Sequence, residues 1–343
     1  MADEKSHPVH LEPSELGTKE YWDEYYQNDL ENGVGSEDEN GAEQDAGAGD
    51  EDEDDHATES QQQPPDPSEL DSWFDDVGAP AKTLAFLTST TFPLSPNYIA
   101  PTGSKEGDRD PADPSVLDLG TGNGSALFAL RLQGHYTGRM VGVDYSTKSV
   151  ELARKLRAQY AASTTATATA TATDSNMENI TFEVLDIIHD PPGSQPWWPP
   201  LGPRGGHGGF DLVLDKGTFD AISLSSSTVF DRASTRQRRI CELYPAKVLE
   251  MVKTGGFLLV TSCNWTEAEV IAWFTSPGGG GSSESADVAS SEGTGIPEDG
   301  CERAVFEVYD TIKYPVFEFA GQKGQGVASV CFRKLHRNMT DQG

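Results

Sequence analysis

The 343-residue sequence lacks several features that would assign it to a specialised class of proteins. It has no apolar run of 18 residues and no apolar segment behind Met1, so neither a membrane span nor a secretory leader is expected. Its cysteines, Cys241, Cys263, Cys301 and Cys331, include no C-x-x-C pair, so neither disulfide bonds nor a metal site is expected. These absences favour a soluble, cytoplasmic protein.

Basic residues are absent from one long segment. Between Glu20 and Ala81 there is no Lys or Arg, whereas Asp and Glu together occur 22 times. This segment therefore accounts for 22 of the 31 excess negative charges of the chain. Such a block of like charge is typical of a disordered, solubilising stretch. Since the sequence has no basic stripe that could neutralise phosphates, no direct nucleic-acid partner is expected.

Four stretches of biased composition are expected to be disordered insertions that do not pack. They are an acidic, Gln/Pro-rich stretch, an Ala/Ser/Thr run, a Pro/Gly-rich stretch and a Gly/Ser-rich stretch, at residues 29–70, 160–176, 190–209 and 275–300. None can bury enough apolar surface to offset its chain entropy. The remaining residues, about 240, suit one α/β domain, expected over 71–335 behind an N-terminal motif segment, 1–28.

The most informative stretch is Val116-Leu-Asp-Leu-Gly-Thr-Gly-Asn-Gly124. Its apolar residues predict a buried strand, which runs into three closely spaced glycines and then a helical pattern. Strand, glycine turn and helix in this order form the first βα unit of a nucleotide- or cofactor-binding sheet. A second strand, at 140–145, contains Asp144, 20 residues after Gly124, where a carboxylate can accept two hydrogen bonds from a ribose diol.

The spacing of the glycines distinguishes two classes of ligand. Dinucleotide-binding turns have G-x-G-x-x-G and receive a pyrophosphate. Here the spacing is G-x-G-x-G, and Asp118 stands two residues before the first glycine. A carboxylate there would repel a pyrophosphate but attract the amino group and sulfonium of S-adenosylmethionine. The pattern resembles motif I of the seven-strand S-adenosylmethionine-dependent methyltransferases.

The remaining sequence alternates strands and helices as a doubly wound α/β sheet does. Strands are expected at 115–119, 140–145, 180–187, 210–215 and 257–263, and helices at 123–133, 147–159, 238–252 and 266–274. The third helix is expected to end at Gly255-Gly256. Two last strands, near 305–313 and 326–334, have no helix between them, so one must be antiparallel. The methyltransferase resemblance implies a seven-stranded sheet of order 3-2-1-4-5-7-6 ending in this antiparallel hairpin.

Longer motifs narrow the resemblance to one family. They are Y-W-D-x-Y-Y within Leu16–Tyr26, S-W-F-D-D at Ser72–Asp76, D-K-G-T-F-D within Phe210–Ile222, and S-C-N-W at Ser262–Trp265. Together they resemble the fungal branch of the protein-lysine methyltransferases that modify translation elongation factor 1-alpha. The resemblance covers most of the chain outside the four biased stretches. It implies S-adenosylmethionine as cofactor and the elongation factor as protein substrate, and a monomer is expected.

The resemblance also implies roles for individual residues in binding the cofactor. The backbone at Gly120, Gly122 and Gly124 would lie against S-adenosylmethionine. Asp118 would stand near its amino group, and Asp144 would hold the ribose hydroxyls.

Four more residues are expected at the cofactor. Asp186, with Ile187 beside it, would accept a hydrogen bond from the adenine amine at the end of the third strand, unless it is simply a solvated carboxylate. Trp22 and Tyr26 would close over the cofactor or fasten the N-terminus to the domain, and the sequence leaves both roles open.

Asp215 is the residue expected at the chemical step, because it ends the fourth strand beside the point where open α/β sheets bind ligands. A lysine must lose its proton before it attacks a methyl group, which costs about 4.6 kcal/mol at pH 7 for an unperturbed side chain. Burial and the nearby sulfonium both lower the pKa of the amine. The carboxylate would therefore mainly orient the amine, whereas Lys216 and Asp220 are expected to be structural.

Other functions remain open from the sequence. The acceptor could be another protein or a small molecule, or the fold could persist as a binding module without catalysis. The intact glycines, Asp144 and Asp215 weigh against the binding module, and the glycine spacing disfavours a dehydrogenase.

Overall fold

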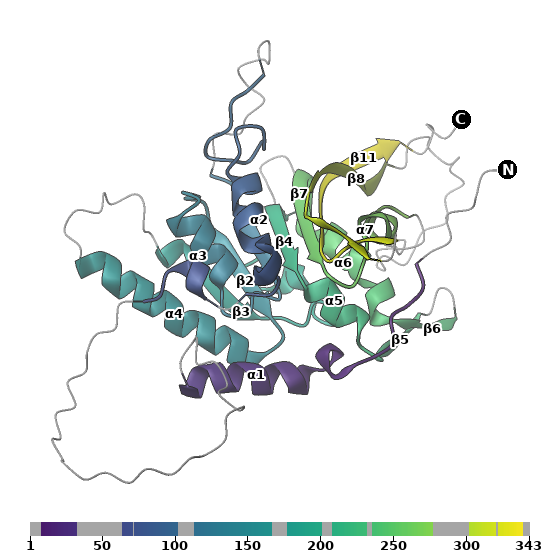
Figure 1. Ribbon diagram of the computed structural model, residues 1–343, viewed down its shortest axis with the longest axis horizontal. Coiled ribbons are helices and arrows are strands. Elements are labelled where there is room, and N and C mark those ends of the chain that lie inside the picture. The colour runs from purple at the N-terminus through teal and green to yellow at the C-terminus, as the bar shows by residue number, and fades with distance from the viewer. Residues whose placement is uncertain are drawn as a thin grey trace, which may run out of the picture.

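The computed structural model describes residues 8–32, 64–70, 72–101, 113–166, 177–200, 208–231, 235–276, 302–319 and 322–338. Figure 1 shows a central sheet with helices packed on both of its faces. The sheet has seven strands in the order β3-β2-β1-β4-β7-β11-β8. These strands are β1 (Val116–Leu119), β2 (Met140–Asp144), β3 (Ile180–Val184), β4 (Phe210–Lys216), β7 (Val252–Ser262), β8 (Glu302–Ile312) and β11 (Ala328–Asn338). Counted among themselves they read 3-2-1-4-5-7-6, so the predicted strand order is confirmed.

The directions of the strands create one edge at which a site can form. β1, β2, β3, β4 and β7 are parallel, so their carboxyl ends meet at the same edge of the sheet. β11 is antiparallel to both β7 and β8, which confirms the antiparallel end of the sheet. Between β8 and β11 lies a further ribbon, β9 (Val316–Phe319) with β10 (Gln322–Gln325), which the sequence analysis does not predict.

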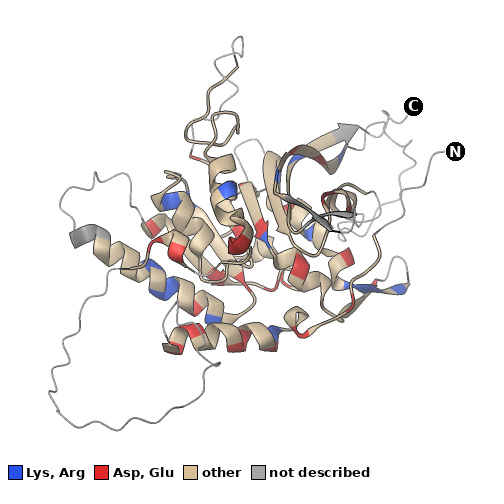
Figure 2. Ribbon diagram, in the orientation of Figure 1, with Lys and Arg blue, Asp and Glu red and all other residues tan. Residues whose placement is uncertain are grey.

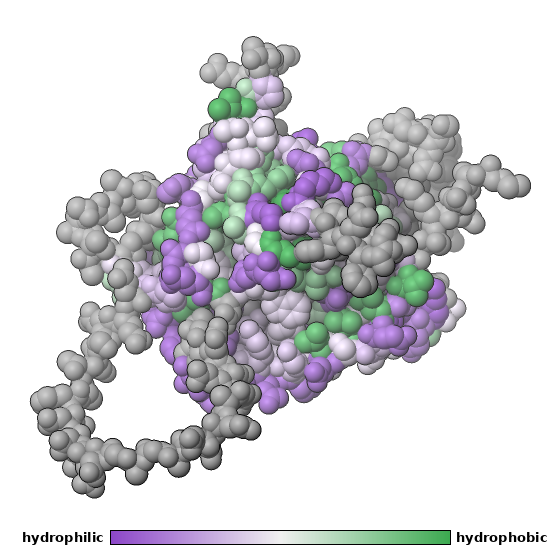
Figure 3. Space-filling view, in the orientation of Figure 1, coloured by the Kyte–Doolittle hydropathy of each residue, from purple (hydrophilic) through white to green (hydrophobic). Residues whose placement is uncertain are grey.

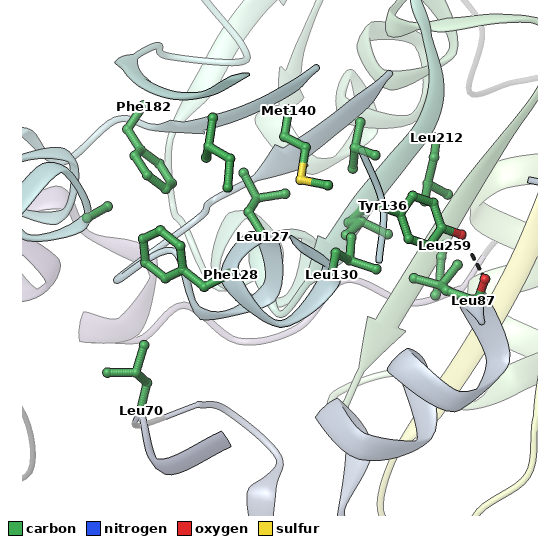
Figure 4. Close-up of a cluster of buried hydrophobic side chains, with 14 of the residues drawn as sticks. Leu70, Leu87, Leu127, Phe128, Leu130, Tyr136, Met140, Phe182, Leu212 and Leu259 are labelled. Atoms are coloured by element: carbon green, nitrogen blue, oxygen red, sulfur yellow. Dashed lines mark hydrogen bonds between the residues drawn. The ribbon is translucent and has the colours of Figure 1, made fainter. Parts of the chain in front are cut away.

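Alternate residues of each strand face two separate hydrophobic cores, because successive side chains of a strand point to opposite faces. Val116 of β1 and Leu212 of β4 pack in the first core, which Figure 4 shows in part. Leu117 and Val213, one residue later on the same strands, pack in the second.

The helices divide between these two cores. Helices α2 (Ala79–Leu87), α3 (Ser125–Leu132) and α4 (Thr147–Ala166) supply buried residues to the first core. Helices α5 (Thr218–Ser223), α6 (Tyr244–Met251) and α7 (Glu267–Thr275) supply the second. Helix α1 (Lys19–Asn32) lies across the edge formed by the carboxyl ends of the parallel strands. Among the described helices, none is both long and apolar enough to cross a membrane.

The helix predicted over 238–252 is wrong in its first half. Residues Arg236–Arg239 form β6, which pairs with β5 (Thr228–Asp231) in a separate antiparallel ribbon. The side chain of Arg239 donates hydrogen bonds of 2.6–2.9 Å to three backbone carbonyls, one of them that of Leu11, far away in the sequence. α6 begins only at Tyr244, with a proline in its first turn, where no amide donor is needed.

The predicted end of that helix is also wrong. α6 ends at Met251, and Gly255-Gly256 lie inside β7. Gly255 has a φ of +83°, close to the shift in register between β4 and β7. These glycines therefore lie at an irregularity in β7. Glycine is common at such positions in strands as well as at helix ends.

The predicted insertions are too wide at their ends. α1 continues to Asn32, and the segment 64–70 is docked through buried Leu70 and a hydrogen bond of 2.6 Å from Tyr160 to the Pro65 carbonyl. α4 continues to Ala166, and Trp197 is buried in the second core. The rest of the four stretches, 33–63, 167–176, 201–207 and 277–300, lies outside the described residues.

Candidate active site

A cavity of about 430 Å³ lies at the carboxyl ends of the parallel strands. Its walls come from the turn after β1, the end of β2, the loop after β3, the turn after β4 and one side of α1. Of the ten residues that the sequence assigns to the site, eight line this cavity, and Gly124 and Asp215 do not: the eight are Trp22, Tyr26, Asp118, Gly120, Gly122, Asp144, Asp186 and Ile187.

The turn after β1 requires glycine for two different reasons. Gly120, Gly122 and Gly124 all have left-handed backbones, with φ of +62°, +57° and +85°. Gly122 also lies directly against helix α1, since a Cβ there would be 2.7 Å from the Tyr26 hydroxyl. Gly124 faces the core instead, where a Cβ would lie 2.7 Å from Phe182. The third glycine therefore permits close packing at the start of α3, away from the cavity wall.

Two buried carboxylates flank the glycine turn. Asp118 accepts a hydrogen bond of 2.7 Å from the Thr121 hydroxyl, and burial raises its pKa to about 6. Asp144 accepts hydrogen bonds from the backbone amides of Gly122, at 3.1 Å, and Ser146, at 2.9 Å. Burial also raises the pKa of Asp144. Carboxylates that are costly to ionise when the cavity is empty favour a ligand that brings positive charge or hydrogen-bond donors.

Residues Ser14–Asn32, which include α1, form the roof of the cavity. The roof is fastened on one side by the Ser14 amide, which donates 3.0 Å to the Leu224 carbonyl. On the other side, the Ser146 hydroxyl donates 2.6 Å to Asp23. Both of these bonds join parts of the chain that are far apart in the sequence.

Three aromatic side chains line the underside of the roof. Trp22 packs against Trp73, with ring centroids 5.2 Å apart, and its indole donates 2.9 Å to the Leu16 carbonyl. Tyr26 stacks on Trp22 at 6.1 Å and lies over Gly122. The same residues therefore fasten the N-terminal segment and line the cavity, and their closing over the cofactor stays a prediction.

Asp186 and Ile187 line the cavity from a loop. β3 ends at Val184, so the strand is shorter than predicted, and Asp186 follows it by two residues. The Asp186 carboxylate accepts from the amides of Ile188, at 2.9 Å, and His189, at 3.1 Å, and lies 2.8 Å from the His189 ring. Its oxygens thus already shape the loop at the mouth of the cavity.

Asp215 points away from the cavity. It pairs in register with Leu119, and its side chain is buried on the face of the sheet that carries the second core. One oxygen accepts from the amides of Thr218, at 3.0 Å, and Phe219, at 3.1 Å, and the other accepts 2.8 Å from the Tyr244 hydroxyl. Burial raises the pKa of Asp215 to about 7. The carboxylate therefore holds the β4–α5 turn, and the following residues of that turn line the cavity.

The cavity wall also includes residues that the sequence interpretation did not assign to the site, among them Trp73, Thr218 and Lys216, which was expected to be structural. The Thr218 hydroxyl donates 2.6 Å to the Leu119 carbonyl, which ties the turn after β4 to the end of β1. Lys216 and Thr218 flank the glycine of D-K-G-T, so the motif itself contained the signal. Asp220 is structural as expected, since it accepts from the Ser262 hydroxyl and the Cys263 amide at the end of β7.

Comparison with known proteins identifies the family. A family model described as a methyltransferase domain matches residues 112–289. The chain is 30% identical to protein-lysine N-methyltransferase EFM4 of Saccharomyces cerevisiae over 94% of this chain and 96% of that protein. The chain belongs to the protein-lysine methyltransferases. Within this family it is also 28% identical to efm4 of Schizosaccharomyces pombe, over 94% of this chain and 95% of that protein. EEF1A lysine methyltransferase 2 of Mus musculus is 30% identical over 65% of each chain.

The methyl donor of this methyltransferase is S-adenosylmethionine, and the cavity fits it. The volume lies within the range of small-molecule sites, about 300–1,000 Å³. The left-handed glycines at 120 and 122 leave backbone open to the ligand, and two buried carboxylates suit a cation and a ribose. When bound, the group supplies an electrophilic methyl on a sulfonium, and the chain supplies the walls that hold and cover it.

Proposed function

We propose that this protein transfers methyl groups from S-adenosylmethionine to a lysine of translation elongation factor 1-alpha. The similarity to EFM4 along nearly the whole of both chains carries this proposal, together with the similarity to the mouse EEF1A lysine methyltransferase 2. The protein acts in the cytoplasm as a monomer, without direct contact to nucleic acid. One catalytic domain, residues 71–335, does the chemistry, and the N-terminal segment, 1–28, covers its cofactor.

Each wall of the cavity has a proposed partner on the cofactor. Asp144 accepts from the ribose hydroxyls and Asp118 from the amino group, while the backbone of the glycine turn lies along the ligand. The Asp186 loop, with Ile187, borders the adenine. Trp22 and Tyr26 cover the ligand with flat apolar surface, which excludes water from the charged centre.

The chain contributes to methyl transfer by orientation. An amine brought beside a sulfonium into a water-poor cavity loses its proton more easily, because burial and like charge both lower its pKa. Asp215 is proposed as a positioning residue, since its oxygens already accept three hydrogen bonds. It fixes the β4–α5 turn, and that turn sets the direction from which the amine approaches the methyl group.

The surface beside the cavity supports a macromolecular acceptor. The β5–β6 ribbon rises from residues 225–227 and Ile240, which line the cavity. Phe230 on this ribbon is 54% exposed, and the Arg236 side chain is 63% exposed. Figure 2 shows basic residues side by side on this ribbon, and Figure 3 shows apolar surface at the same end. An apolar residue exposed beside arginines is suited to protein contact.

The decisive experiment uses elongation factor purified from cells that lack this gene. Incubation with the purified protein and S-adenosylmethionine should add methyl groups to one lysine, as read by peptide mass spectrometry. Phe230→Ala should raise KM for the elongation factor and leave S-adenosylhomocysteine affinity unchanged, with Ile99→Ala, at an exposed apolar residue away from the cavity wall, as the matched control. Full methylation of the factor in the deletion cells, or no methylation in vitro, would refute the proposed substrate.

The role of Asp215 is tested separately by single-turnover rates. Asp215→Asn keeps one acceptor oxygen for the turn amides and should retain more activity than Asp215→Ala, with S-adenosylhomocysteine affinity within a few-fold of wild type in both. The loss in Asp215→Ala should be much larger in the rate of methyl transfer than in cofactor binding. Equal and wild-type rates in the two variants would remove Asp215 from any role in the reaction.

A further inference from the structure

Lys216 is the cation of the cavity wall that the mechanism above leaves unused. Three side chains of the described wall can carry positive charge: Lys19, His189 and Lys216. Lys19 forms an ion pair of 2.5 Å with Asp23, and His189 lies 2.8 Å from the Asp186 carboxylate. Lys216 forms no ion pair within the described part of the chain, and burial lowers its pKa. A partly buried ammonium that forms no ion pair among the described residues, on the wall of a ligand cavity, favours a bound anion.

The strand register places this ammonium on the same face of the sheet as Asp118. Asp118 of β1 is paired with Leu214 of β4, and Lys216 is two residues further along β4. Residues two apart on a strand point to the same face, about 7 Å from each other. Asp118 is the first of the two carboxylates whose charge favours the protonated form of Lys216. The Asp118 carboxylate and the Lys216 ammonium therefore lie on the same face of the sheet, on the neighbouring strands β1 and β4.

This pair matches the methionine end of the cofactor, which has an ammonium and a carboxylate on the same carbon. We propose that the Lys216 ammonium binds the carboxylate of the methionine moiety, while Asp118 receives its amino group. Asp118 and Lys216 then each face an opposite charge of the ligand. The inference concerns the cofactor alone, so it stands or falls independently of which protein is the methyl acceptor.

The test compares two ligands that differ in the amino-acid moiety. S-adenosylhomocysteine carries the ammonium and the carboxylate, whereas 5′-methylthioadenosine has neither. In calorimetry, Lys216→Gln should weaken S-adenosylhomocysteine by about tenfold or more, as expected for a lost hydrogen bond between charged groups. The same variant should change 5′-methylthioadenosine affinity by less than about twofold. Lys216→Arg, which keeps the charge, should retain S-adenosylhomocysteine affinity within a few-fold.

Two controls separate this role from a structural one. Lys155→Gln removes a positive charge from an exposed site on α4 and should change neither affinity. Lys216→Gln should melt at or above the wild-type temperature, because it removes a partly buried charge whose ionised form is disfavoured when the cavity is empty. Equal weakening of both ligands would show general damage to the cavity, and unchanged S-adenosylhomocysteine affinity would show that no carboxylate is bound there. Either result overturns the proposal.

Discussion

Gly122→Ala tests whether the roof lies directly on the glycine turn. The substitution has two separable costs. An alanine at a φ of +57° costs about 1–2 kcal/mol because its Cβ crowds the backbone. In addition, that Cβ would lie 2.7 Å from the Tyr26 hydroxyl, so the partly buried tyrosine must move.

Tyr26→Phe removes the second cost and leaves the first. Without the hydroxyl, the next ring atom is 3.5 Å from the Cβ position, which is an ordinary contact. Gly122→Ala should therefore cost only about 1–2 kcal/mol in the Tyr26→Phe background. In the wild-type background it should cost more by a coupling energy of about 0.5–3 kcal/mol. Denaturant unfolding followed by tryptophan fluorescence measures all four proteins.

Gly255→Ala is the matched control for this cycle. Gly255 also has a positive φ, +83°, but a Cβ there would meet no heavy atom within 4 Å. Gly255→Ala should therefore lower the free energy of unfolding only by the cost of the positive φ, and by the same amount in the wild-type and Tyr26→Phe proteins. If Gly122→Ala also costs the same in both, the Tyr26 hydroxyl does not lie over Gly122, and the description of the roof is wrong.

Three further measurements follow from burial and pKa. Cofactor affinity should rise between pH 5 and 7, because burial raises the pKa of Asp118 to about 6 and its carboxyl must lose a proton to accept the ligand amino group; calorimetry in two buffers would detect the released proton. Burial raises the pKa of Asp215 to about 7, so folding stability falls as pH rises from about 4 to 7, and Asp215→Asn should flatten the pH dependence of Tm over that range. Deleting residues 37–62 should leave the free energy of unfolding unchanged, whereas deleting 37–70 also removes buried Leu70 and should cost at least about 1.5–3 kcal/mol in denaturant unfolding.

The sheet and its glycine turn were predictable because the signal is local. Nine consecutive residues, 116–124, contain the strand and the turn that leads into α3, and all three glycines of that turn have left-handed backbones. The antiparallel end was predictable because two strands without a helix between them cannot be parallel neighbours. The helix predicted over 238–252 was wrong because contacts with residues distant in the sequence determine the local structure there. Arg239, for example, donates a hydrogen bond to the carbonyl of Leu11.

The contacts that dock the roof and the direction of the Asp215 side chain could not be predicted from the sequence, for a related reason. The composition of α1 is polar and acidic, and its docking depends on contacts with Leu224 and Ser146, more than a hundred residues away. Strand alternation does show that Asp215 and Lys216 point to opposite faces. The helices α5, α6 and α7 cover the face of the sheet to which Asp215 points, so the cavity opens on the opposite face. The sequence does not show which face these helices cover.

The roof has a consequence for how the enzyme can be taken apart. It is joined to the remaining domain through residues 33–63, yet what keeps it in place is a set of contacts at Ser14, Trp22, Asp23 and Tyr26. Continuity of the chain is therefore dispensable in principle, and a synthetic peptide of residues 8–32 should assemble with a chain that begins at residue 64. Since cofactor and peptide would stabilise one another, a fluorescent label on the peptide would turn the enzyme into a sensor of its own cofactor occupancy.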